Sequence, residues 1–109
     1  MKKFIGLIPT RIGSTRLPSK PLLEINGIPL VIHTYKRAKL SKKLDDVIIC
    51  CDDKKILNVA KKFKAKCILT SKHHNNGTER ITEVAHKLKD KYDFIVDIQG
   101  DEPLISPDH

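Results

Sequence analysis

Apolar positions along the chain follow two alternating patterns, short continuous runs and longer stretches with helical spacing. Runs typical of buried strands cover residues 3–8, 46–51, 66–69 and 94–98. Stretches typical of amphipathic helices cover residues 29–40, 53–63 and 81–88. Strands that alternate with helices form parallel sheets with right-handed crossovers. The pattern therefore predicts an α/β fold, a mostly parallel sheet with flanking helices, in a single domain over residues 1–109.

Local signals support these boundaries. Residues 22–27 form a short extended piece that ends in an Asn-Gly turn signal, and Pro29 can occupy the first turn of the first helix. Asp53 is a candidate N-cap of the second helix. Asn76, followed three residues later by Glu79, resembles a capping box at the start of the third.

Three polar loops each follow a predicted strand, at residues 9–21, 70–80 and 99–103. Since the carboxyl ends of parallel strands lie at one edge of a sheet, where open α/β sheets bind ligands, we expect these loops to converge on one crevice. The chain stops soon after the fourth strand, with no further helix to cover it. We therefore expect part of the sheet to lie uncovered and the polypeptide to be a truncated piece of a larger protein.

Composition is typical of a soluble globular protein, with 39% hydrophobic and 31% charged residues. No run approaches the roughly 18 apolar residues of a membrane span, and the N-terminus lacks the features of a signal peptide. These observations predict a cytoplasmic location and no membrane partner.

The net charge of +8 is compatible with nucleic-acid binding, but only four of the 21 basic residues are arginines. No aromatic residues are interleaved with the basic ones to stack on bases. Several lysines fall on the polar side of the second predicted helix: Lys54, Lys55, Lys61, Lys62 and Lys64. We interpret them as a solvated face and expect no nucleic-acid partner.

Three cysteines, Cys50, Cys51 and Cys67, fall in predicted strands. Adjacent strand residues point to opposite faces, so Cys50 and Cys51 are poorly placed to share a metal or to form a relaxed disulfide. We expect buried free thiols with no chemical role.

The loop after the first strand contains three cations, Arg11, Arg16 and Lys20, and two hydroxyls, Ser14 and Thr15. Arg forks, a Lys charge and inward-pointing backbone amides can hold a chain of phosphates. The spacing is not that of a Walker A loop. A solvated basic loop is the alternative that the composition leaves open.

The other two loops carry weaker signals. Asp101 and Glu102 follow the fourth strand and could hold Mg²⁺ against phosphate oxygens, or serve as capping or turn residues. Gln99 could donate to a substrate or simply end the strand. Arg80, one turn into the third helix, could read a pyrimidine edge beside the helix-start amides, or lie on the solvent side.

Taken in order, four motifs span the whole chain and resemble those of the 3-deoxy-manno-octulosonate cytidylyltransferases, the CMP-Kdo synthetases. The motifs are Ile8-Pro9-x-Arg11-x-x-Ser14-Thr15-Arg16-Leu17-Pro18-x-Lys20-Pro21-Leu22, Ile25-Asn26-Gly27-x-Pro29, Asn76-Gly77-Thr78-Glu79-Arg80 and Gln99-Gly100-Asp101-Glu102-Pro103. The last two favour the Kdo enzymes over the related CMP-sialate synthetases.

This resemblance implies a Rossmann-like nucleotidyltransferase fold, of which residues 1–109 are the N-terminal, CTP-binding part. It also implies an enzyme that joins CTP and Kdo to give CMP-Kdo and pyrophosphate with Mg²⁺, for lipopolysaccharide synthesis. The full-length parent is expected to be a homodimer.

The resemblance also assigns roles by position. The residues expected to bind the triphosphate are Pro9, Arg11, Ser14, Thr15, Arg16 and Lys20, with Lys20 nearest the α-phosphate. Arg80, with the backbone near Ser71 and Gly77, would help to recognise cytosine. Gln99 would sit near the ribose or the acceptor sugar, and Asp101 would bind Mg²⁺. The residues expected to act in catalysis are Arg11, Lys20, Gln99 and Asp101.

The chain departs from the family pattern in three respects. Thr10 stands where Ala is common, and Ser71 stands where some members carry Arg. The family's second half, which supplies another metal-binding carboxylate, most of the sugar site and the dimer contacts, is absent. We therefore predict the activity for the parent protein and expect this piece to bind CTP weakly without turnover. The alternatives are a cytidylyltransferase for an amino-Kdo or another acidic sugar, and a non-catalytic basic nucleotide-binding fragment.

Overall fold

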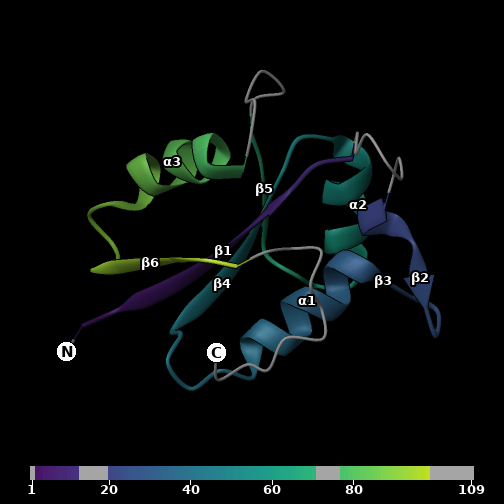
Figure 1. Ribbon diagram of the computed structural model, residues 1–109, viewed down its shortest axis with the longest axis horizontal. Helices are drawn as coiled ribbons and strands as arrows, with labels where there is room; N and C mark the ends of the chain where they lie inside the picture. Colours follow the sequence, from purple (N-terminus) through teal and green to yellow (C-terminus); the bar gives the residue numbers. More distant parts are fainter. Residues whose placement is uncertain (1, 13–19, 71–76, 99–109) are drawn as a thin grey trace.

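A four-stranded parallel sheet lies at the centre of the protein (Figure 1). The computed structural model describes residues 2–12, 20–70 and 77–98. The strands, in the order in which they lie side by side, are β5 (Cys67–Leu69), β4 (Asp46–Cys51), β1 (Phe4–Thr10) and β6 (Phe94–Asp97). All three neighbouring pairs are parallel, which confirms the predicted sheet.

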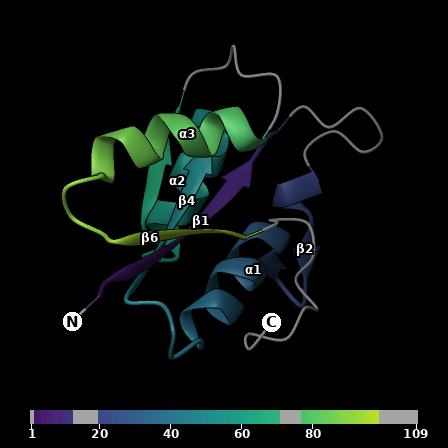
Figure 2. The same ribbon diagram turned by 60° about the vertical axis from the view of Figure 1, so that its left-hand side comes forward.

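Helices cover both faces of this sheet (Figure 2). The helices are α1 (Leu30–Lys39), α2 (Lys54–Lys62) and α3 (Gly77–Leu88). One core cluster joins α1 and α2 to Ile8 and Ile49, and a second joins α3 to Leu7 and Ile48. Because β1 and β4 are covered on both sides, nearly every residue along them is buried, which explains their continuous apolar runs.

The segment between β1 and α1 contains a 3-10 helix, η1 (Lys20–Leu22), and a small antiparallel hairpin of β2 (Glu24–Ile25) and β3 (Ile28–Pro29). Asn26 and Gly27 form its turn, with φ angles of 55° and 79°. A two-residue hairpin turn with positive φ at both positions favours the Asn-Gly pair, so the predicted turn is confirmed. Pro29 lies just before α1 as its N-cap residue, one position earlier than expected.

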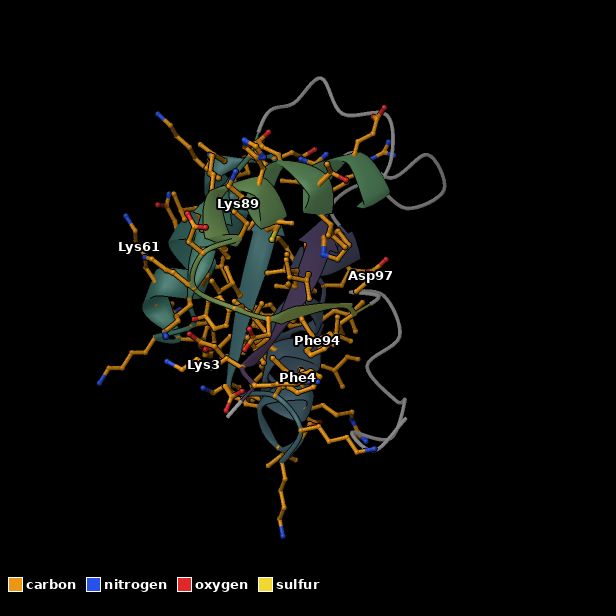
Figure 3. All side chains as sticks on the ribbon, turned by 90° about the vertical axis from the view of Figure 1, so that its left-hand side faces the viewer. Lys3, Phe4, Lys61, Lys89, Phe94 and Asp97 are labelled. Atoms are coloured by element: carbon orange, nitrogen blue, oxygen red, sulfur yellow. The ribbon has the colours of Figure 1, made fainter. Side chains whose placement is uncertain are left out.

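Helix α2 begins where the sequence predicts. The Asp53 side chain accepts a hydrogen bond from the backbone N–H of Lys55 at 2.8 Å, which confirms it as the N-cap. Ile56 and Ala60 are buried against the sheet, while the lysines of this helix are exposed. Figure 3 shows Lys61 pointing away from the protein. The lysine-rich face is therefore solvated, as expected.

The amino ends of the strands are held together by Asp46. Its carboxylate accepts hydrogen bonds from Lys66 Nζ at 2.8 Å, Tyr92 Oη at 2.9 Å and the backbone N–H of Val47 at 3.0 Å. Burial alone would raise the pKa of Asp46, but the hydrogen bonds from Lys66, Tyr92 and Val47 outweigh it and hold the pKa below its ordinary value.

Because its pKa is lower in the folded state, ionised Asp46 should stabilise the fold above the ordinary Asp pKa and lose that effect as the pH falls through the lowered value. We expect Asp46→Asn to reduce the free energy of unfolding at pH 7, and the difference from wild type to shrink as the pH falls below the ordinary Asp pKa of about 4 and through the lowered value. Urea unfolding of both proteins across this range would measure it. A difference that stays constant with pH would contradict this role.

Strand β6 is the edge strand of the described sheet and exposes apolar side chains. Phe94 and Val96 are 44% and 40% exposed. The Phe94 ring stacks on that of Phe4, with 4.7 Å between the ring centroids (Figure 3). Part of the described sheet is thus uncovered, as the sequence predicts. Among the described residues, no helix has both the length and the apolar character needed to cross a membrane.

Candidate functional site

The carboxyl ends of β1, β4 and β5 lie next to one another. Thr10, the last residue of β1, pairs with Cys51, the last of β4, and Cys51 pairs with Leu69, the last of β5. The chain therefore leaves β1, β4 and β5 at the same edge of the sheet (Figure 1). This is the edge at which α/β proteins bind ligands.

Arg80, from the first turns of α3, is completely buried at this edge. Its Nη1 donates to Thr70 Oγ1 at 2.5 Å, and its Nη2 lies 4.0 Å from Asp52 Oδ2. Thr70 is itself fixed, because its backbone N–H and its hydroxyl both donate to the carbonyl oxygen of Cys51, at 2.7 Å and 3.0 Å. Of the two positions that the sequence left open for Arg80, the solvent side of the helix is excluded.

Asp52 is a residue at this edge that sequence reasoning missed. Its Oδ1 accepts the backbone N–H of Ile12 at 3.0 Å, while Oδ2 faces Arg80. One signal could have identified it: Asp52 directly follows a buried strand, the same feature that singled out Asp101. The connection from β4 to α2 contains only two residues, 52 and 53, so it lacks the long polar stretch that marks the three predicted loops.

Several predicted binding residues lie near this edge. Pro9 is part of β1 and pairs with Cys50. Arg11 follows β1 directly and is exposed. Lys20 begins η1, which packs beside α1, and Gly77 is the first residue of α3. The structure thus places the start of the predicted phosphate loop and the start of α3 around the same strand ends.

The remaining predicted site residues lie outside the described residues. They are Ser14, Thr15, Arg16, Ser71, Gln99 and Asp101, and the proposed helix cap Asn76 lies there as well. Their predicted roles stay predictions. In the described ranges 2–12, 20–70 and 77–98, no three His, Cys, Asp or Glu side chains gather in a way that could hold a metal ion.

The three cysteines are free thiols, of which Cys50 and Cys51 are buried and Cys67 is partly buried against the core. Cys50 packs in the cluster under α3 and Cys51 in the cluster under α1 and α2, which confirms that they point to opposite faces. Burial raises the pKa of Cys50 to about 12, so this thiol is not a nucleophile at neutral pH. The Sγ atoms of Cys51 and Cys67 lie 3.3 Å apart, and the hydrogen bond between them lowers the pKa of Cys51.

A sequence model of one protein family, described as Cytidylyltransferase, matches residues 5–109. The chain belongs to this family. Among its relatives, a 3-deoxy-manno-octulosonate cytidylyltransferase of Fusobacterium nucleatum is 52% identical over 94% of the chain. A mitochondrial 3-deoxy-manno-octulosonate cytidylyltransferase of Arabidopsis thaliana is 45% identical over 98% of it. The resemblance to CMP-Kdo synthetases seen in the four motifs is confirmed.

The fold agrees with this family. The solved structure of a CMP:2-keto-3-deoxy-manno-octonic acid synthetase complexed with CTP matches 98% of the chain with a TM-score of 0.93 and 40% identity. The Rossmann-like nucleotidyltransferase fold is thereby confirmed. The chain spans 41% of the Fusobacterium relative, 38% of the Arabidopsis relative and 44% of the solved chain.

Proposed function

We propose that the full-length protein is a cytidylyltransferase that joins CTP to Kdo and releases pyrophosphate, supplying CMP-Kdo for lipopolysaccharide synthesis. The observation that carries this proposal is the match, over nearly the whole chain, to a synthetase solved with CTP. The relatives named as 3-deoxy-manno-octulosonate cytidylyltransferases support Kdo as the acceptor. The location of Arg11 and Arg80 near one set of strand ends is consistent with an anionic nucleotide at that edge.

In the proposed reaction the anomeric hydroxyl oxygen of the sugar attacks the α-phosphorus of CTP. A bond forms between that oxygen and the α-phosphorus, the bond from the α-phosphorus to the bridging oxygen of the β-phosphate breaks, and the hydroxyl proton passes to solvent. Negative charge grows on the departing pyrophosphate. Arg11 and Lys20 act as counterions to this charge, with Arg16, Ser14 and Thr15 completing the loop.

On the cytosine side, Arg80 acts together with the backbone near Ser71 and Gly77. The guanidinium is held by Thr70 and Asp52, so its orientation is fixed before any nucleotide binds. A fixed fork of N–H donors suits discrimination between the edges of different bases.

Mg²⁺ is the proposed cofactor, with Asp101 as a ligand. A carboxylate supplies the oxygen donor that Mg²⁺ prefers, and the phosphate oxygens of CTP supply others. When bound, the ion neutralises charge on the phosphates. Gln99 is proposed to contact the ribose or the acceptor sugar. The full-length protein is proposed to form a homodimer.

A pyrophosphate-release assay on the full-length protein tests this proposal. We expect the highest kcat/KM with CTP and Kdo, and much lower values with ATP or UTP or with sialic acid as the acceptor. Faster turnover with an amino-Kdo than with Kdo would still support a cytidylyltransferase, but with the amino sugar as its acceptor. Salt-sensitive binding to RNA or DNA without turnover of CTP would contradict the proposal.

A further inference from the structure

Asp52 contacts two parts of the site that are far apart in sequence. Its Oδ1 accepts the N–H of Ile12, next to Arg11, and its Oδ2 lies 4.0 Å from Nη2 of Arg80. We propose that Asp52 is a positioning residue that fixes the start of the phosphate loop, at Arg11 and Ile12 directly after β1, relative to Arg80. This inference rests on the proposed function.

The position of Asp52 is itself well determined. Cys51, before it, ends β4 and accepts two hydrogen bonds from Thr70. Asp53, after it, caps α2 through the N–H of Lys55. The Asp52 side chain is only 15% exposed, and both of its oxygens face a specific neighbour. Because this carboxylate is already ordered, it can hold its neighbours in place with little further loss of its own conformational entropy.

The two contacts have different physical character. The bond to Ile12 has ordinary hydrogen-bond length, so its loss would leave a backbone donor without this acceptor. The 4.0 Å separation from Arg80 is too long for a hydrogen bond and acts through charge. Because Arg80 is fully buried, removal of this nearby negative charge would disturb the orientation of the guanidinium.

Asp52→Ala and Asp52→Asn separate the two contacts. Alanine removes both, so the phosphate loop loses its anchor and CTP should bind about tenfold more weakly or worse. CMP lacks the outer phosphates and should lose less affinity. Asparagine keeps an oxygen for the N–H of Ile12 but presents an uncharged amide to Arg80. It should weaken CTP and CMP binding by similar factors, about threefold to tenfold.

Simple repulsion between Asp52 and the phosphates predicts the opposite change in CTP affinity. If repulsion were the only effect of Asp52, both variants would bind CTP more tightly than the wild type, because both remove the negative charge. The matched control is Asp53→Ala, which removes the same charge one residue away and costs about 1 kcal/mol of helix capping. This control should bind CTP and CMP like the wild type.

The test is calorimetric titration of the full-length wild type and the three variants with CTP and with CMP, with thermal unfolding to confirm that each is folded. A fall in the CTP-to-CMP affinity ratio in Asp52→Ala, together with an unchanged ratio in Asp52→Asn, is the expected result. Wild-type or tighter CTP binding in Asp52→Asn would overturn the inference even if Asp52→Ala does not fold. A wild type that binds neither nucleotide would instead overturn the proposed function, and this inference with it.

Discussion

Replacing Arg11 or Lys20 by alanine in the full-length protein is expected to lower kcat by about 10²-fold or more. The two residues flank the loop that leaves β1 at the carboxyl edge of the sheet, with Arg11 next to the end of β1 and Lys20 at the start of η1. Both are proposed to lie beside the triphosphate, where negative charge grows on the departing pyrophosphate as its bond to the α-phosphorus breaks. Because the interaction strengthens in the transition state, its loss should reduce kcat and not only substrate affinity.

Steady-state kinetics with saturating CTP and Kdo would measure this loss. Lys61→Ala is the matched control, because it removes the same charge from the exposed face of α2. It should leave kcat unchanged. Near-normal turnover in both Arg11→Ala and Lys20→Ala would move the reaction centre away from this loop.

Arg80→Lys is expected to lower the preference of the full-length enzyme for CTP over UTP by about tenfold or more. Lysine keeps the positive charge beside Asp52 but replaces the planar fork of donors by a single ammonium group. Arg80→Ala should do more, since it removes a fully buried side chain from both Thr70 and Asp52. Its expected cost in stability is about 3 kcal/mol or more.

Competition between CTP and UTP, combined with urea unfolding, would distinguish the two effects of Arg80. If a stably folded Arg80→Lys protein kept the wild-type preference for CTP over UTP, the guanidinium would have a structural role and no role in recognising the base. Equal stability of Arg80→Ala and wild type would contradict the packing described above.

Much of the architecture was predictable because its signals are local. The double-sided burial of β1 and β4 gives continuous apolar runs, and the Asn26-Gly27 turn and the Asp53 cap follow from backbone chemistry. The predicted end of the first strand was too early by two residues, since Pro9 lacks an N–H donor. Proline is tolerated there because, among the described residues, β6 pairs with β1 only as far as Leu7, so Pro9 lies beyond the last of these pairs and beside β4.

The interior of the site was less predictable because it depends on contacts between distant residues. Arg80 lies four residues before Val84, on the side of α3 that packs against the sheet. A charged residue on such a side is buried only where other residues supply hydrogen-bond or ion-pair partners. Those partners, Thr70 and Asp52, come from the ends of two other strands. No spacing along the sequence shows that Asp52 also reaches the N–H of Ile12.

The most direct test of the proposed nucleotide site is to titrate the full-length protein with CTP and follow its backbone amide resonances. The carboxyl edge of the sheet should respond first, with the largest shifts at Ile12, Asp52 and Thr70. The amides of Val47 and Lys66, near the opposite edge, should change little. Shifts confined to the lysine-rich face of α2, or equal shifts with inorganic triphosphate and with CTP, would contradict a cytidine nucleotide site at these strand ends.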